Sequence, residues 1–165
     1  MTNRLRDVTL CFLVQKSNGK VENICLAMKK RGFGKGKWNG VGGKVEQNET
    51  IEEAVVRETE EEIGVNPKEI EKVATITFLF THNKDWDQLV HVYFASKWDG
   101  EPRESDEMRP KWFSVQKIPY KSMWVDDEIW LPKVLKGEKV IATFIFDENE
   151  RILYREILSV KADEL

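Results

Sequence analysis

The hydrophobic positions of the chain follow two different periods, which predict a sheet accompanied by two helices. Apolar, β-branched and aromatic residues run together, as they do in strands, over residues 8–14, 23–28, 73–80, 89–95, 111–115, 139–146 and 152–158. Asn18-Gly19 and the polar residues 147–150 are turn signals that join neighbouring strands into hairpins. Strands outnumber helices, and we therefore expect an α+β fold with a mixed sheet that carries helices on its faces.

Two segments have helical character. Over residues 51–63 the apolar positions recur at helical spacing. Thr50 and Glu53 have the spacing of a capping box, and Gly64 suits the left-handed end of a helix. A second helix is expected over residues 128–135, where Pro132 is tolerated only in the first turn.

The first of these helices ends in a crowd of glutamates. At about 100° per residue, Glu58, Glu61 and Glu62 continue the apolar stripe, whereas Arg57 points away from it. An exposed acidic turn is the alternative, but it would lie opposite the apolar stripe, and the helix dipole disfavours anions near a C-terminus. Because hard divalent cations require several oxygen ligands, the pattern predicts a metal site.

A glycine-rich loop lies just before this helix. Six of the chain's ten glycines fall between Gly32 and Gly43, so the segment either bends tightly or lets another group approach its backbone. Lys35, Lys37 and Lys44 suit a polyphosphate. The segment matches neither the P-loop pattern nor the dinucleotide-binding pattern. A flexible surface loop is the alternative interpretation.

Composition narrows the class of protein. With 165 residues, 41% of them hydrophobic, and a net charge of −3, the chain is expected to form one domain over residues 1–165. No apolar run is long enough to span a membrane, and mild acidity argues against wrapping long nucleic acid. Cys11 and Cys25 are interpreted as reduced core residues of a cytoplasmic protein. The six tryptophans and eight phenylalanines exceed the needs of a small core, so some are expected to line a pocket.

Residues 43–65 read GKVEQNETIEEAVVRETEEEIGV and resemble the Nudix box. The pattern of this box is a glycine, any five residues, a glutamate, any seven residues and then Arg-Glu-x-x-Glu-Glu-x-Gly. The matching residues are Gly43, Glu49, Arg57, Glu58, Glu61, Glu62 and Gly64. Thr59 departs from the usual aliphatic residue. The stretches MKKRGFGKGKWNGVGGKV, ESDEMRP and MWVDDEIWLP resemble the branch of Nudix hydrolases that acts on oxidised purine nucleoside triphosphates.

This resemblance implies a Nudix α/β/α sandwich with a mixed β-sheet core. It implies a Mg²⁺-dependent enzyme, in which Mn²⁺ can replace Mg²⁺, that converts 8-oxo-dGTP and 2-hydroxy-dATP to the monophosphate and pyrophosphate. Such an enzyme sanitises the nucleotide pool and prevents DNA damage. The expected partner is a nucleoside triphosphate, with no long nucleic acid and no membrane, and the expected assembly is a monomer.

Site residues follow from the resemblance by position. The metal ligands would be Glu58, Glu61, Glu62, Glu107 and the carbonyl of Gly42, with Arg57 orienting the glutamates. Either Glu61 or Glu107 would accept the proton of the attacking water. The substrate-binding residues would be Thr9, Lys29, Phe33, Asn39, Gly42, Gly43, Lys44, Phe78, Phe80, Trp124, Asp126 and Asp127. Of these, Lys29 and Lys44 would face the phosphates.

Several interpretations stay open at this point. Asp126 and Asp127 either cap the second helix or accept the N–H donors of a purine, next to a stacking Trp124. His82 and His91 lack partners at metal-binding spacing. Residues 81–90 form a longer segment than the family usually has, and Gln88 stands where a methionine is expected. The alternative functions are a Nudix hydrolase of another nucleoside diphosphate-linked substrate, such as ADP-ribose, and a catalytically silent nucleotide-binding module.

Overall fold

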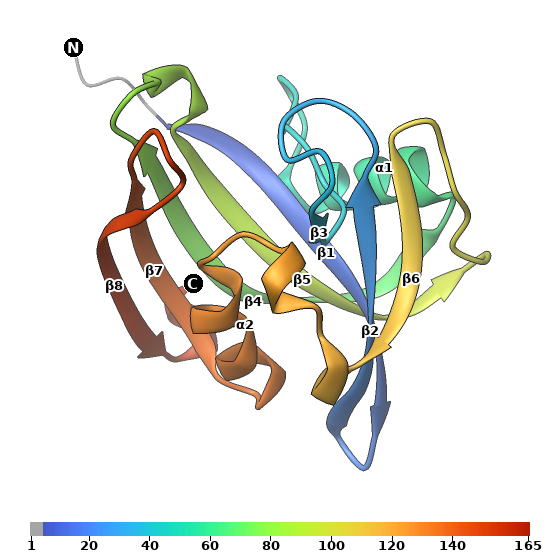
Figure 1. Ribbon diagram of the computed structural model, residues 1–165. Coiled ribbons are helices and arrows are strands. Elements are labelled where there is room, and N and C mark those ends of the chain that lie inside the picture. Colours follow the sequence, from blue (N-terminus) through green and yellow to red (C-terminus); the bar gives the residue numbers. More distant parts are fainter. Residues whose placement is uncertain (1–4) are drawn as a thin grey trace.

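The computed structural model describes residues 5–165, and the strands in this range form one mixed sheet between two helices (Figure 1). The strands are β1 (Arg6–Ser17), β2 (Lys20–Lys29), β3 (Trp38–Asn39), β4 (Asn66–Phe80), β5 (Gln88–Asp99), β6 (Met108–Ser114), β7 (Lys139–Phe146) and β8 (Ile152–Val160). The α-helices are α1 (Ile51–Ile63) and α2 (Asp127–Leu135). The first four residues of the predicted domain lie outside the described residues.

The sheet combines parallel and antiparallel neighbours. Its order is β3-β2-β1-β5-β4-β7-β8, and β6 pairs with β2. The pairs β1–β5 and β4–β7 are parallel, whereas the other pairs are antiparallel. Asn18 and Gly19 both have positive φ, 52° and 77°, as the predicted β1–β2 hairpin requires.

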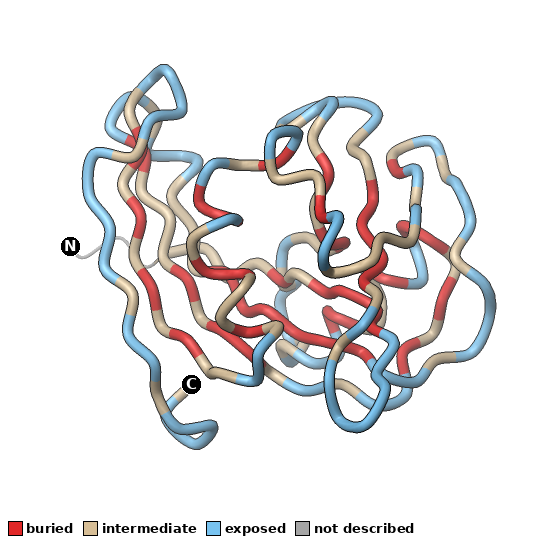
Figure 2. Tube along the Cα trace, turned by 60° about the horizontal axis from the view of Figure 1, so that its bottom comes forward, coloured by how far each residue is buried: buried red, intermediate tan, exposed pale blue. Residues whose placement is uncertain are grey.

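The two helices pack on opposite faces of the sheet. In β1, Phe12 and Val14 belong to the core that includes residues of α2, whereas Cys11 and Leu13 belong to the core that includes residues of α1. This alternation is the period of a strand buried on both faces, and buried segments run through the middle of the sheet (Figure 2). The predicted α+β sandwich with a mixed sheet is confirmed.

Helix α1 has the bounds that the sequence predicts. The Thr50 hydroxyl accepts a hydrogen bond from the Glu53 N–H at 3.1 Å, and the Glu53 carboxylate accepts one from the Thr50 N–H at 2.9 Å. Gly64 ends the helix in the left-handed region at φ 72°. Both helix ends therefore follow from local sequence signals.

Helix α2 corrects one expectation. Pro132 was expected in the first turn, but α2 begins at Asp127 and places this proline in the second turn. The missing N–H of Pro132 deprives the carbonyl of Glu128 of its helical donor. Because Glu128 is exposed, water can satisfy that carbonyl, and the short helix tolerates the proline.

The strands are mostly longer than predicted, and β3 was not predicted. The largest difference between the predicted and observed strands is the first half of β4, which was not predicted. Register shifts interrupt its pairing with β5 and break the alternation of apolar and polar residues. Cys11 and Cys25 are buried free thiols, and burial raises the pKa of each to about 12. In the described part of the chain, no helix is long and apolar enough to cross a membrane.

Candidate active site

The end of the glycine-rich loop is fixed along β1. Thr9 N–H donates to the Gly43 carbonyl at 2.9 Å, and Val41 and Cys11 exchange two backbone hydrogen bonds. A Cβ on Gly42 would overlap the carbonyl oxygen of Thr9, and a Cβ on Gly43 would lie 2.5 Å from Glu58 Oε1. Gly42 therefore requires glycine because of the close backbone approach, Gly43 packs against the Glu58 carboxylate, and the interpretation as a flexible surface loop fails there.

Arg57 connects this loop to the glutamates of α1. Its guanidinium binds both carboxylate oxygens of Glu49, at 2.6 and 2.9 Å, and lowers the pKa of Glu49 to about 2. It also donates to Glu58 Oε1 at 2.8 Å, to Glu61 Oε2 at 3.3 Å and to the Lys44 carbonyl at 3.1 Å. Arg57 starts on the side of α1 away from the apolar stripe, but its long side chain reaches back to both glutamates, which agrees with the orienting role that the resemblance implies.

The glutamates differ in burial. Glu62 is 9% exposed, whereas the side chain of Glu61 is 60% exposed. The expectation that Glu61 continues the buried stripe is therefore wrong. Thr59 occupies the buried position, with its hydroxyl donating to the Val55 carbonyl at 2.7 Å. The hydroxyl of this unusual residue is thus satisfied inside the helix.

More negatively charged than positively charged groups influence Glu62. Burial raises the pKa of Glu62 to about 7, and the charge of Glu107 is the next largest cause. Lys29 opposes this shift, whereas Glu58 and Glu61 add to it. Glu107 itself pairs with Arg31 at 3.2 Å. The structure thus brings Glu107 from its loop into the field of the helix glutamates.

The oxygen atoms of the glutamates are chemically suitable ligands for a divalent cation, but they do not converge on one point. Among residues 5–165, no three Asp, Glu, His or Cys side chains converge in an arrangement that could hold a metal ion. Arg57 draws Glu58 and Glu61 toward itself. The charges of Glu107, Glu58 and Glu61 nevertheless add to the effect of burial in raising the pKa of Glu62, and a cation would neutralise that crowding. Rotations of exposed side chains would have to complete the ligand set.

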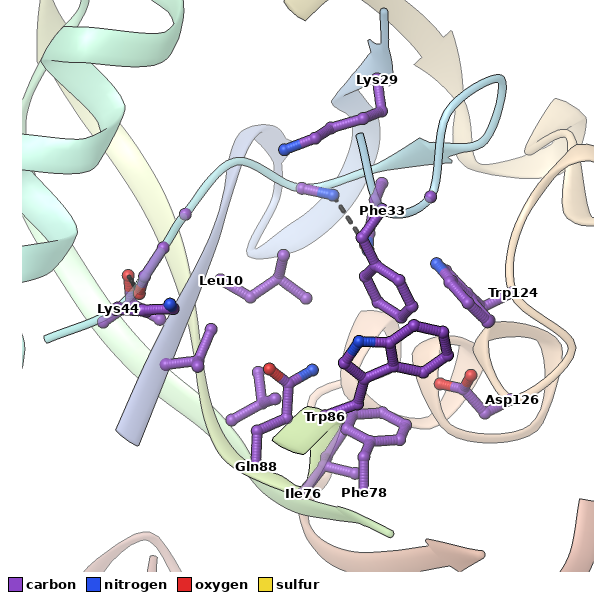
Figure 3. Close-up of a pocket in the computed structure, with 18 of the residues that line it drawn as sticks. Leu10, Lys29, Phe33, Lys44, Ile76, Phe78, Trp86, Gln88, Trp124 and Asp126 are labelled. Atoms are coloured by element: carbon purple, nitrogen blue, oxygen red, sulfur yellow. Dashed lines mark hydrogen bonds between the residues drawn. The ribbon is translucent and has the colours of Figure 1, made fainter. Parts of the chain in front are cut away.

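A cavity of about 570 Å³ opens beside these residues (Figure 3). All of the predicted substrate-binding residues line it, namely Thr9, Lys29, Phe33, Asn39, Gly42, Gly43, Lys44, Phe78, Phe80, Trp124, Asp126 and Asp127. In Figure 3, Lys44 lies toward α1, whereas Trp124 and Asp126 lie toward α2. The cavity thus runs from the neighbourhood of the glutamates to the aspartate pair.

Asp126 occupies the N-cap position of α2 without capping it. Its side chain makes no cap hydrogen bond and instead accepts a hydrogen bond from Trp130 Nε1 at 2.8 Å. Asp127 is 3% exposed, and its Oδ2 atom has no hydrogen-bond partner among the described residues. The interpretation of Asp126 as a simple helix cap is therefore wrong.

The two aspartates have unequal affinities for a proton. Burial raises the pKa of Asp126 to about 6, while the hydrogen bond from Trp130 opposes that rise. Burial and the charge of Asp126 raise the pKa of Asp127 well above its usual range. Of the two, Asp127 therefore holds a proton more tightly, and a pair with one ionised and one protonated carboxyl group would offer both an acceptor and a donor.

Aromatic and amide groups surround this pair. The rings of Phe33 and Trp124 lie 5.1 Å apart, and Phe80 stacks on Phe146 at 5.6 Å. Asn39 accepts a hydrogen bond from the Gly40 N–H at 2.8 Å, which leaves its amide nitrogen for other partners. Sequence reasoning missed Leu10, Trp86, Trp130 and Phe146 as lining residues. Only Trp130 carried a signal, its position one helical turn after Asp126.

Two further expectations have structural outcomes. Lys37 was expected to suit a polyphosphate, but its ammonium group lies 5.1 Å from the centre of the Trp124 ring and pairs with Glu150 at 3.4 Å. His91 lies in a strand between Lys72 and Asp7, at 2.9 Å from each. It is a buried link within the sheet and does not line the cavity.

A model of the NUDIX domain family matches residues 4–134, and the chain therefore belongs to the Nudix family. It is 42% identical to a protein of Danio rerio named oxidized purine nucleoside triphosphate hydrolase, over 93% of this chain and 95% of that protein. It is equally similar, at 42%, to a Mus musculus protein of the same name, over 92% of both chains. The predicted family and class of enzyme, a Nudix hydrolase, are confirmed.

The fold has solved counterparts. A crystal structure described as a mutator MutT protein from Bacillus halodurans superimposes with a TM-score of 0.79 at 25% identity, covering 93% of this chain and 97% of that one. Nudix hydrolases generally use divalent metal ions, which agrees with the oxygen donors around Glu62.

Proposed function

We propose that this protein is a Mg²⁺-dependent pyrophosphohydrolase that converts 8-oxo-dGTP and 2-hydroxy-dATP to the monophosphate and pyrophosphate, and so sanitises the nucleotide pool. The observation that carries the proposal is the composition of the cavity. It holds a buried aspartate pair and a tryptophan on the side of α2, and glycine backbone and lysines beside the box glutamates. A purine nucleotide has the matching polarity, with a base at one end and phosphates at the other.

The aspartate pair supplies the specificity in this proposal. A purine presents N–H donors and ring acceptors on its pairing edge, and a carboxylate next to a carboxylic acid can satisfy both kinds of group. Because the protonated and ionised members can exchange roles, the same pair suits oxidised guanine and oxidised adenine. Trp124 offers a face for stacking, and the free amide nitrogen of Asn39 can serve an oxidised position.

The glutamates supply the chemistry. Glu58, Glu61, Glu62, Glu107 and the Gly42 carbonyl would hold Mg²⁺, for which Mn²⁺ can substitute. When bound, the ion polarises the phosphates and lowers the pKa of water. Arg57 orients Glu58 and Glu61, Lys29 and Lys44 neutralise phosphate charge, and either Glu61 or Glu107 takes the proton of the attacking water.

The proposal extends to where and how the chain works. We infer one domain over residues 1–165 that acts as a monomer on free nucleotides in the cytoplasm, rather than on long nucleic acid or at a membrane. The net charge of −3 and the two buried free thiols support this inference. A catalytically silent module would be free to lose box carboxylates, and this chain keeps every one of them.

A substrate panel tests the proposal. Pyrophosphate release with Mg²⁺ is measured for 8-oxo-dGTP, 2-hydroxy-dATP, dGTP, dATP and dCTP, with ADP-ribose assayed for hydrolysis in parallel. We expect kcat/KM for both oxidised purines to exceed that for dGTP and dATP by at least about tenfold, because a site built to hydrogen-bond its substrate rejects analogues that lack the matching group. A chelator should abolish all activity. A preference for dCTP or ADP-ribose would refute the assignment.

A further inference from the structure

Trp86 is an aromatic residue of the cavity that belongs neither to the glycine-rich loop, nor to the Nudix box, nor to the segment that carries the aspartate pair. It ends the short 3₁₀ turn Lys84–Trp86, within the connection between β4 and β5 that spans residues 81–87 and is called the β4–β5 loop below. Its side chain lines the cavity although the residue is 37% exposed. In Figure 3 the indole points toward Phe33 and Trp124, in the interior of the group of lining residues.

The ring contacts of Trp86 join the β4–β5 loop and the end of β4 to the glycine-rich loop and, through Phe33, to Trp124. The indole centre lies 4.9 Å from the ring of Phe33, 5.7 Å from Phe80 and 5.2 Å from His82. Phe33 comes from the glycine-rich loop and also contacts Trp124 at 5.1 Å. Phe33 therefore touches both Trp86 and Trp124, and these three rings form a continuous aromatic surface.

Polar groups close the β4–β5 loop. Asn83 Oδ1 accepts a hydrogen bond from the Asp85 N–H at 3.1 Å, and Asp87 Oδ1 accepts one from the Phe80 N–H at 2.7 Å. Arg6 donates to the Asp85 carbonyl at 3.1 Å. Because these bonds close the turn without the indole, and Trp86 is 37% exposed, its ring is available to a ligand.

We propose that Trp86 is a further substrate-contacting residue, which determines preference for purines by adding a second aromatic surface to the one that Trp124 supplies. The inference rests on the proposed function and deepens it. A base whose edge meets Asp126 and Asp127 lies among the rings of Phe33, Trp86 and Trp124. Stacking is tolerant of base identity but grows with ring area, so a purine gains more from Trp86 than a pyrimidine does.

The test compares Trp86→Ala and Trp86→Phe with Trp98→Ala. Trp98 is a matched control because it is also partly buried and stacked, on Trp112 at 5.7 Å, but does not line the cavity. We expect Trp86→Ala to raise KM for 8-oxo-dGTP by about 5- to 150-fold, with little change in kcat, because stacking losses have that size and the glutamates are untouched. Trp86→Phe should restore most of the affinity, and Trp98→Ala should lower Tm without changing KM.

A binding measurement separates this inference from the proposed function. Calorimetry without metal gives the affinity of each variant for 8-oxo-dGMP and for dCMP. If the wild-type enzyme hydrolyses no oxidised purine triphosphate but Trp86→Ala still weakens 8-oxo-dGMP more than dCMP, the proposed function fails and the role of Trp86 stands. Wild-type affinity and wild-type KM in Trp86→Ala, with only a lower Tm, would overturn the inference and make Trp86 a loop anchor.

A substitution that retains bulk keeps the test decisive if Trp86→Ala does not fold. Trp86→Leu preserves an apolar side chain but removes the ring, so its comparison with Trp86→Phe isolates stacking. Weaker binding of 8-oxo-dGMP to Trp86→Leu than to Trp86→Phe supports the inference, and equal binding to the two variants overturns it.

Discussion

At the scale of single residues, Glu62 has the most demanding environment in the site. It is a buried carboxyl group at the end of α1, and the fields of Glu107, Glu58 and Glu61 oppose its ionisation. Such crowding costs stability unless a cation neutralises it. We therefore interpret the Glu62 carboxylate as a ligand for a divalent metal and not as part of the core.

Glu62→Gln is expected to abolish turnover while the protein stays folded. The amide keeps the shape of the side chain but removes the charge that would bind the ion. In the absence of metal its Tm should equal or exceed that of the wild type, because the substitution removes a repelled charge. Circular dichroism and pyrophosphate release check both parts. Full activity of the variant at saturating Mg²⁺ would contradict the metal-site interpretation.

Asp127 gives a pH dependence of stability whose sign can be worked out. Its pKa is raised in the folded protein, so the folded state keeps the proton over a pH range in which the unfolded chain has already lost it. Wild-type stability therefore falls as pH rises from about 4 toward the folded pKa. Asparagine cannot ionise, so Asp127→Asn escapes this loss.

Relative to the wild type, Asp127→Asn should thus gain stability between about pH 5 and about pH 8, by at most about 1.4 kcal/mol per pH unit. Urea unfolding at both pH values measures the difference. Asp147→Asn is a suitable control because the pKa of Asp147 is lowered, and that variant should lose stability relative to the wild type above the unfolded pKa. A constant difference between Asp127→Asn and wild type at both pH values would contradict the raised pKa.

Residue-level reasoning from the sequence has a clear limit here. A carboxylate before a helix looks the same whether it caps the helix or faces a ligand, and only the hydrogen bond to Trp130 and the burial of Asp126 decide between them. Trp86 stands in a polar segment without periodicity, so nothing in the sequence assigns it to a cavity. Its position depends on the turn around Asn83 and Asp87, which is a tertiary property.

At the scale of elements, α1 shows what local sequence can and cannot establish. Its ends follow from Thr50 and Gly64, because capping involves only neighbouring residues. The direction of Arg57 does not follow from a helical wheel, which gives the side on which a side chain starts and not where a long one ends. The guanidinium reaches Glu49, eight residues earlier, and so fixes the loop to the helix.

Arg57→Lys is expected to lower kcat by about 10- to 100-fold with a small change in Tm. Lysine keeps the charge but cannot bind Glu49 with two parallel bonds while also donating to Glu58 and Glu61. The expected size of the decrease in kcat is that of the losses of activity seen when groups that orient metal ligands are removed. Steady-state kinetics at saturating metal checks it. An unchanged kcat would show that Arg57 supports the loop and does not position the glutamates.

At the scale of the whole molecule, the cavity is assembled from segments that the sequence keeps far apart. Thr9 of β1, the glycine-rich loop, the facing ends of β4 and β5, and the start of α2 meet on one side of the sheet. The resemblance named many of the lining residues, but the bulges in β4 and the length of the β4–β5 loop depend on strand pairing. Periodicity alone could not predict them.

A divalent metal should stabilise the whole domain. A ligand of the native state at about 100 times its Kd adds about 2.7 kcal/mol, which for a chain of this size raises Tm by roughly 5–10 °C. A thermal scan across Mg²⁺ concentrations measures the shift, and Glu62→Gln should show much less of it. No shift in the wild type up to millimolar Mg²⁺ would count against a site where crowded glutamates await a cation.

The most direct test of the assignment is kcat/KM for 8-oxo-dGTP, 2-hydroxy-dATP and dCTP in the wild type, Asp126→Asn and Asp127→Asn. Loss of a carboxyl group leaves a buried donor or acceptor of the base unpaired, at a cost of about 1–3 kcal/mol. Both variants should therefore lose about 5- to 150-fold for the oxidised purines, while slow hydrolysis of dCTP changes little because the glutamates are intact. Wild-type kcat/KM for both oxidised purines in both variants would contradict recognition by the aspartate pair and leave a Nudix hydrolase without an assigned substrate.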